Sequence, residues 1–147
     1  MEAYIAMEGF TLPSGFVIKE LTILYTNGEY DHHLFLPPTS RYLSEVDKTT
    51  IRYTTSKINQ LSWTDGAIPY SCVDDILNKL KDCKIFTFSG ISLKTLQKYL
   101  PTAVIINIQD FGFEMPSLLP HPHCFRAHSH RYCAKAKAFA IKHFMEN

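Results

Sequence analysis

The stretch KIFTFSGISLKTLQKYLPTAVIINI, residues 84–108, indicates how this chain folds. Lys84–Phe88 is a short strand-like run, Ser92–Leu100 has a helical pattern closed by a proline, and Ala103–Ile108 is almost wholly apolar. A strand, a helix and a second strand in this order predict a parallel pair of strands joined by a crossover helix. The apolar second strand predicts that the pair is buried on both faces.

An antiparallel hairpin is predicted upstream of this unit. Phe16–Tyr25 is rich in β-branched and aromatic residues, and Tyr30–Leu36 is predicted to pair back on it. Between them, Asn27-Gly28 favours a two-residue turn, because both positions of such a turn need a positive φ. Pro37-Pro38 ends the second strand, since proline donates no hydrogen bond to a sheet.

The remaining segments predict helices. Ser40 or Ser44 is placed to cap a short polar helix, while Thr49–Ser56 fits either a third strand or a helix. Tyr70–Leu80 and the Ala/Lys-rich segment Arg131–Met145 are both predicted helices. The first of these has an apolar face made of Val73, Ile76, Leu77 and Leu80.

Length and composition favour a single globular domain. The 147 residues are 46% hydrophobic and 20% charged, so we expect one α/β domain over residues 1–147, with its core at about 14–145. Its mixed sheet would start with the antiparallel hairpin and be flanked by helices. No apolar run is long enough for a bilayer, and the N-terminus lacks a basic leader, so we expect no membrane association and a cytoplasmic or nuclear location.

A cluster of possible metal ligands lies near the C-terminus. Cys124, His128, His130 and Cys133 fall within ten residues, just before and inside the first turn of the last predicted helix. Thiolate and imidazole are the ligands with which zinc closes structural sites, so the cluster predicts a structural Zn²⁺. The alternative is that Cys133 packs as a small apolar residue and the histidines are solvated.

A further ligand is predicted far away in the sequence. Glu20 is an acid within an otherwise apolar strand, with Lys19 and Leu21 directed to the other face. If buried, its carboxylate needs a partner, and a metal would be one; an exposed Glu20 on a half-open sheet is the alternative. The adjacent pair His32-His33 is a weaker candidate, because neighbouring strand residues point to opposite faces.

The C-terminal segment is basic. Arg126, Arg131, Lys135 and Lys142 are the residues that we expect to contact nucleic-acid phosphates. Trp63 and Tyr70 are expected as exposed aromatic residues on which bases could stack. An ordinary solvated helix face is the alternative for the lysines.

The order of these elements resembles the ribonuclease H-like fold of the DEDD 3′–5′ exonucleases. That family holds two Mg²⁺ ions with acids on the first strand, on a later helix, and in a closing His-x4-Asp. Here Glu20 keeps one acid and Thr22 stands where the second should be, residues 84–109 contain no Asp or Glu, and His128-x4-Cys133 replaces the closing motif.

A degenerate site of this kind is similar to that of the Maelstrom domain, in which Glu, Cys, His and Cys bind one structural zinc. Over residues 14–145, the resemblance matches Glu20 to the glutamate on that family's first strand. It matches Cys124 and His128 to the Cys and the following His, and Cys133 to the Cys of the Cys-Ala that opens the last helix. Three residues separate Cys124 from His128, which is more than in that family, so His130 is an alternative to His128.

The resemblance implies a non-catalytic, zinc-binding pseudo-nuclease that binds nucleic acid, most directly single-stranded RNA, in small-RNA, mobile-element or viral biology. Two alternatives stay open from the sequence. One is a nuclease with a non-standard site, using Glu20, Asp110 and histidines. The other is a protein-interaction module in which zinc only holds the fold together.

Overall fold

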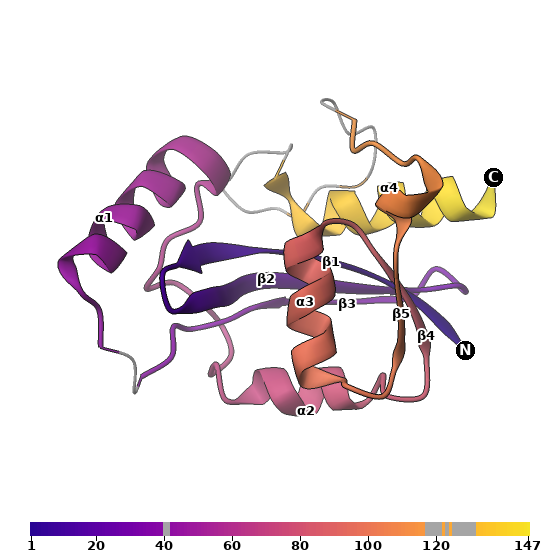
Figure 1. The fold of residues 1–147 in the computed structure, drawn as a ribbon, viewed down its shortest axis with the longest axis horizontal. Helices are drawn as coiled ribbons and strands as arrows, with labels where there is room; N and C mark the ends of the chain where they lie inside the picture. The colour runs from indigo at the N-terminus through magenta and orange to yellow at the C-terminus, as the bar shows by residue number, and fades with distance from the viewer. Residues whose placement is uncertain (40–41, 117–121, 123, 125–131) are drawn as a thin grey trace.

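The computed structural model describes residues 1–39, 42–116, 122, 124 and 132–147. Its centre is a mixed five-stranded sheet in the order β3-β2-β1-β4-β5 (Figure 1). The first three strands pair antiparallel, while β4 pairs parallel with β1 and with β5. The strands are β1 (Glu2–Leu12), β2 (Gly15–Tyr25), β3 (Tyr30–Leu34), β4 (Lys84–Thr87) and β5 (Val104–Asn107).

Helices cover both faces of the sheet. On one face, side chains of α2 and α3 join Ile5 and Leu21 of the sheet in one apolar cluster. On the other face, α4 packs its alanines against Tyr4 and Leu24. The helical elements are α1 (Glu45–Thr54), the π-helical η1 (Thr55–Asn59), α2 (Cys72–Asn78), α3 (Gly90–Tyr99), the 3-10 turn η2 (Ile108–Phe111) and α4 (Ala134–Glu146).

The predicted fold class is therefore confirmed: the chain forms one α/β domain with a mixed sheet flanked by helices, an arrangement consistent with a ribonuclease H-like fold. The ambiguous segment 49–56 is helical, because it continues α1 into η1. Among the residues that are described, no helix is long and apolar enough to span a bilayer.

The sheet has a strand that the sequence prediction missed. β1 lies between β2 and β4, so Glu20 belongs to the second strand and not to the first. Ala3 and Ile5 are fully buried, and the core therefore extends N-terminal to the predicted start at about residue 14. The Ala- and Met-containing sequence of β1 gives a weak strand signal, since its burial on both faces comes from tertiary packing.

Gly9 lies at an irregularity in the pairing of β1 with β2, and its lack of a side chain has a steric reason. Glu8 lies opposite Glu20 and Gly9 lies opposite Ile18, so Lys19 of β2 is the extra residue of a β-bulge. A Cβ on Gly9 would lie 2.0 Å from the carbonyl oxygen of Val17. Only glycine allows the two backbones to approach so closely.

The turn between β2 and β3 differs from the predicted one. Gly28 has a φ of 89°, but Asn27 is not among the described residues with positive φ. The Tyr25 amide donates to the Glu29 carbonyl at 2.9 Å, so the loop has three residues rather than two. The prediction of two positive φ values was wrong, and the extra loop residue changes the register of the following strand.

The parallel unit forms as predicted in order, but its last strand is not buried on both faces. β5 lies at the edge of the sheet, and Val104 is 59% exposed. An apolar run alone does not distinguish an edge strand from a central one.

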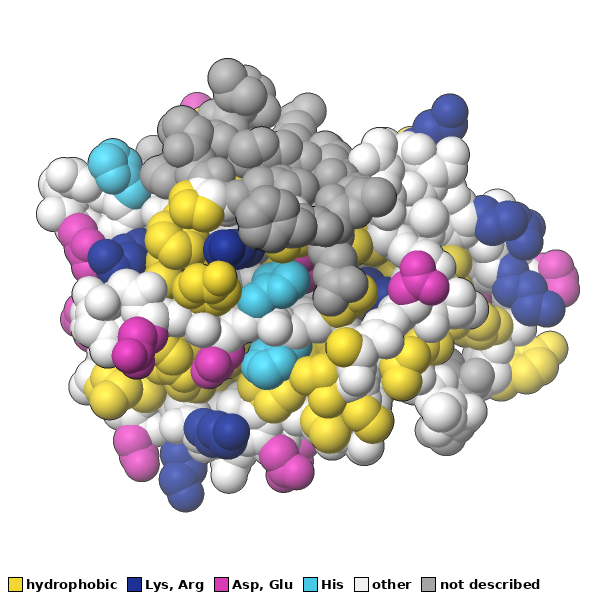
Figure 2. Space-filling model, turned by 180° about the vertical axis from the view of Figure 1, so that it is seen from behind, with side chains coloured by type: hydrophobic (Ala, Val, Ile, Leu, Met, Phe, Trp, Pro, Cys, Tyr) yellow, Lys and Arg dark blue, Asp and Glu magenta, His cyan; other side chains and the backbone are white. Residues whose placement is uncertain are grey.

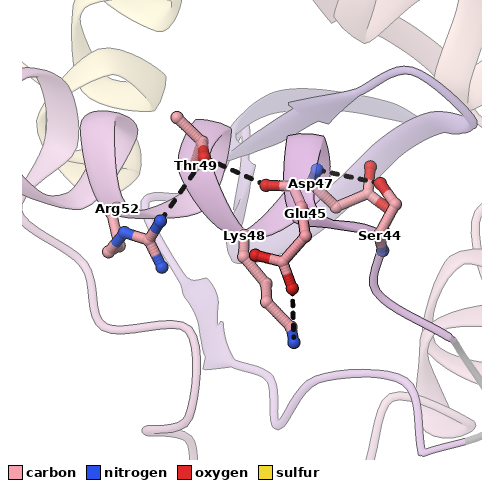
Figure 3. Close-up of polar contacts among 6 residues, drawn as sticks. All are labelled: Ser44, Glu45, Asp47, Lys48, Thr49 and Arg52. Atoms are coloured by element: carbon pink, nitrogen blue, oxygen red, sulfur yellow. Dashed lines mark hydrogen bonds and ion pairs between the residues drawn. The ribbon is translucent and has the colours of Figure 1, made fainter.

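Helix α1 begins at a complete capping box. The Ser44 hydroxyl accepts from the amide of Asp47 at 3.1 Å, and the Asp47 carboxylate accepts from the amide of Ser44 at 3.0 Å (Figure 3). Of the two predicted caps, Ser44 is therefore confirmed, and Ser40 lies outside the described residues. These reciprocal bonds satisfy backbone donors that the first turn of a helix leaves unpaired.

Candidate metal centre

Glu20 is the central residue of a buried polar site between the sheet and α4. Its side chain is fully buried on the α4 face of β2, while Lys19 and Leu21 lie on the opposite face, as predicted. The amide of Ala134, the first residue of α4, donates to Glu20 Oε1 at 2.7 Å. The carboxylate thus sits at the N-terminus of the last helix, where negative charge is favourable.

His32 reaches the same carboxylate from the neighbouring strand. In the β2–β3 register His32 lies opposite Thr22, so it shares a face with Thr22 and is a diagonal neighbour of Glu20. Its Nε2 atom lies 2.8 Å from Glu20 Oε2. His33 lies opposite Leu21 on the other face, where it packs near Phe35.

Cys124 completes a group with the chemistry of a metal site. Its thiol donates to Glu20 Oε2 at 3.3 Å, and both residues are buried. One ligand atom from each of Glu20, His32 and Cys124 lies within 4.8 Å of the others. This buried group could hold a metal ion.

Cys133 lies next to the group. It is fully buried, precedes α4, and its Sγ accepts from the amide of Cys124 at 3.4 Å. A hydrogen bond with Cys133, burial and the charge of Glu20 together raise the pKa of the Cys124 thiol. Without a cation the thiol is therefore protonated, and a bound cation would be needed to stabilise the thiolate.

Thr22 supplies another polar atom to this layer. Its Oγ1 is buried and has no hydrogen-bond partner among the described residues. Since buried hydroxyls are normally paired, the polar layer between β2, β3 and α4 is not fully satisfied by the described side chains alone.

The predicted ligand set is brought together in part. Glu20, Cys124 and Cys133 are connected by the hydrogen bonds given above, although they are distant in the sequence. His128 and His130 lie outside the described residues. His32 was predicted only as half of a weaker His32-His33 pair and not as a partner of Glu20, because only the register of the β2–β3 hairpin shows which of the two adjacent histidines faces Glu20.

The four basic residues predicted to contact nucleic acid differ in their surroundings. Arg126 and Arg131 lie outside the described residues. Lys142 is paired with Glu146 at 2.7 Å, and Lys135 Nζ lies 4.5 Å from the centroid of the Tyr30 ring. Figure 2 shows the side of the molecule opposite to the view in Figure 1, where described basic side chains lie at separate places among acidic ones.

The two aromatic residues expected on the surface are packed instead. The ring of Trp63 meets Phe10 edge-on, with centroids 5.2 Å apart. The hydroxyl of Tyr70 accepts from the amide of Ile18 at 3.1 Å, and its ring packs against Phe35. Both are therefore partly buried members of the core and not free stacking platforms.

A separate cavity of ≈ 390 Å³ lies beside β1, α1 and α3. Among its described lining residues, Glu8 is the one carboxylate, and Lys137 of α4 holds it in an ion pair at 2.5 Å. Asp110 belongs to η2 and is exposed, outside both this lining and the buried group around Glu20. Among the described residues, the group of three potential metal ligands is Glu20, His32 and Cys124, which contains one carboxylate, whereas a two-Mg²⁺ site needs several.

Comparison with protein-family models, with curated proteins and with solved structures finds no match for this chain. The resemblance to the Maelstrom domain accordingly stays a prediction from the sequence.

Proposed function

We propose that this chain is a non-catalytic ribonuclease H-like domain that carries one structural zinc and binds single-stranded RNA. The observation that carries the proposal is the buried meeting of Glu20, His32 and Cys124, with Cys133 beside them.

The donor atoms favour zinc over the common hard cations. Ca²⁺ and Mg²⁺ prefer oxygen ligands, whereas zinc takes thiolate, imidazole and carboxylate together. Ligands about 2.0–2.3 Å from one ion at tetrahedral angles are themselves about 3.3–3.8 Å apart. The separations of Glu20 Oε2 from Cys124 Sγ, 3.3 Å, and from His32 Nε2, 2.8 Å, need little adjustment to reach that geometry.

The position of the group favours a structural role. Glu20 and His32 come from β2 and β3, while Cys124 and Cys133 precede α4, so one ion would tie the two ends of the chain together. Four protein ligands would leave no open position for a substrate or a reactive water. In this proposal His32 supplies the imidazole, and the predicted His128 and His130 are the alternatives for the same position.

The acids support a non-catalytic domain. Glu8 forms an ion pair with Lys137, and the segment 84–109 contains no Asp or Glu. A ribonuclease H-like exonuclease needs several carboxylates around two Mg²⁺ ions. The binding of single-stranded RNA rests on the sequence resemblance and on the basic residues of the C-terminal segment.

One set of purified proteins tests the proposal. The wild-type chain should carry one zinc per molecule by elemental mass spectrometry, and Cys124→Ser should lose it. Cys72→Ser removes a thiol that is half-buried elsewhere and should keep the metal. His32→Gln should lower the zinc content, whereas His33→Gln, which changes a residue on the opposite face of the same strand, should keep it.

The same proteins test RNA binding and cleavage. A labelled oligouridine should bind the wild-type chain and stay intact in the presence of Mg²⁺. Cleavage that disappears in a variant of Glu20 or Asp110 would replace the proposal with the non-standard nuclease. A zinc protein that binds no RNA would leave only the protein-interaction module.

A further inference from the structure

The larger cavity continues into a second one, and together they form a groove that crosses the end of β1. The second cavity has a volume of ≈ 350 Å³ and lies between the β1–β2 turn and α3. Three residues, Thr11, Phe16 and Ile91, line both cavities. The two hollows are therefore parts of one surface.

One end of this groove is basic. Lys94 and Lys98 of α3 line the second cavity and are exposed. They are four residues apart, so they lie on the same face of the helix, about 6 Å from each other along its axis. Because residues 84–109 contain no acid, α3 and its neighbouring strands offer these lysines no carboxylate of their own.

The other end is aromatic and apolar. Tyr53 of α1 lines the larger cavity alone and is 60% exposed, and Ile91, which lines both cavities, is 47% exposed. Phe16 and Phe88 line it as well, each half-buried. Large apolar side chains left in contact with water along a groove commonly mark a binding surface.

The occupant that suits both ends has flat apolar faces and a repeated negative charge. Single-stranded nucleic acid has these properties, because its bases stack on aromatic side chains while its phosphates contact lysines. Glu8 is the one described carboxylate along the groove, and its charge is compensated by Lys137 at 2.5 Å. No carboxylate among the described lining residues pairs with Lys94 or Lys98, although Asp74 of α2 acts electrostatically on Tyr99 at the same cavity.

We infer that a single strand of nucleic acid lies along this groove, with phosphates at Lys94 and Lys98 and a base against Tyr53. The inference rests on the proposed function and adds to it a surface distinct from the C-terminal basic residues. It assigns binding to α3, α1 and the β1–β2 turn, none of which was predicted to contact nucleic acid.

The test measures the fluorescence anisotropy of a labelled oligouridine, with oligothymidine as a second arm. The double variant Lys94→Gln/Lys98→Gln removes two phosphate contacts. It should weaken binding by about tenfold or more and reduce the slope of log K against log salt by about 1.4, since each contact to a single strand contributes about 0.7. Binding of both oligonucleotides supports the groove, and preference for oligouridine would support RNA.

The matched control removes the same charge at a different cavity. Lys81 and Lys84 line a different cavity beside Met1, and both are exposed. Lys81→Gln/Lys84→Gln should leave the affinity and the salt slope close to those of the wild type. An equal loss in both double variants would overturn the assignment, because it would show only a general effect of charge.

A second pair of variants tests the aromatic end. Tyr53→Ala should weaken binding by about tenfold, which is the effect of losing one base stack. Tyr42→Ala removes an exposed tyrosine that lines neither cavity and should have no effect. Equal behaviour of the two tyrosine variants would contradict the placement of a base against Tyr53.

The outcomes separate this inference from the proposed function. One outcome is that Lys94→Gln/Lys98→Gln binds the oligonucleotide like the wild type while Lys135→Gln/Lys142→Gln binds it more weakly. In that case the assignment of binding to the groove is wrong, and the proposal of nucleic-acid binding stands. If the wild type binds neither oligonucleotide, both are wrong. Equally tight binding of an acidic peptide would overturn the choice of nucleic acid as the occupant.

Discussion

The buried Lys19 side chain predicts how the free energy of unfolding changes with pH. Its side chain is 2% exposed on the face of the sheet opposite the candidate metal site. Its ammonium group donates to the carbonyl oxygens of Phe35 and Trp63, both at 2.8 Å, and to that of Asp65. Lys19 thereby connects the loop around Trp63 to β2 and to Phe35, which follows β3.

Burial lowers the pKa of Lys19 from 10.5 to about 8 in the folded chain, against a smaller opposing effect of Asp65. Between these two values the unfolded chain binds a proton that the folded chain has released. Raising the pH through this window therefore stabilises the fold, and lowering the pH from about 10.5 to about 8 removes that contribution. The shift corresponds to an increase of about 2–3 kcal/mol in the free energy of unfolding between about pH 7 and about pH 10.

The assay is urea unfolding at both pH values, followed by circular dichroism and by the fluorescence of the single tryptophan, Trp63. Lys19→Met should abolish the increase attributed to Lys19, and Lys48→Met, which changes an exposed lysine of α1, should retain it. Tyrosines and cysteines that titrate in the same range contribute alike to all three proteins and cancel in the difference. The same pH dependence in wild type and Lys19→Met would refute the reasoning.

Three further predictions follow from the backbone, the first helix and the metal. Gly9→Ala should lower the free energy of unfolding by about 3 kcal/mol, because its Cβ would lie 2.0 Å from the Val17 carbonyl oxygen. Gly90→Ala has open space around its Cβ and should change the free energy of unfolding by no more than about 1 kcal/mol. Urea titrations of the two would contradict this if Gly9→Ala were the milder change. Ser44→Ala should cost about 1 kcal/mol by removing the cap of α1, and an unchanged unfolding midpoint would show that the cap contributes nothing. A strong chelator should lower the melting temperature of the wild type but not of Cys124→Ser, and equal shifts in both would exclude Cys124 as a ligand.

The sequence predicted the elements that carry strong local signals. The β4-α3-β5 unit and the apolar face of α2 combine clear periodicity with turn residues. β1 was missed because Ala, Met and Gly have low strand propensity, and the burial of β1 comes from being placed between β2 and β4. The final position of a strand within a sheet depends on partners that are distant in the sequence.

The candidate site shows the same division between local and distant information. An acid in an apolar strand and two cysteines near the last helix were sufficient to predict Glu20, Cys124 and Cys133. His32 required the hairpin register, and a two-residue turn at Asn27-Gly28 would have shifted that register by one residue. Such a shift exchanges the faces of His32 and His33.

The proposed mixed ligand shell can be measured directly by X-ray absorption at the zinc edge of the purified chain. We predict one zinc with sulfur ligands at about 2.3 Å and nitrogen or oxygen ligands at about 2.0–2.1 Å. In Glu20→Gln the zinc should be lost or should lose one oxygen ligand while sulfur remains. A folded wild-type chain without zinc, or a zinc shell without sulfur, would contradict the assignment of this buried group as a structural zinc site.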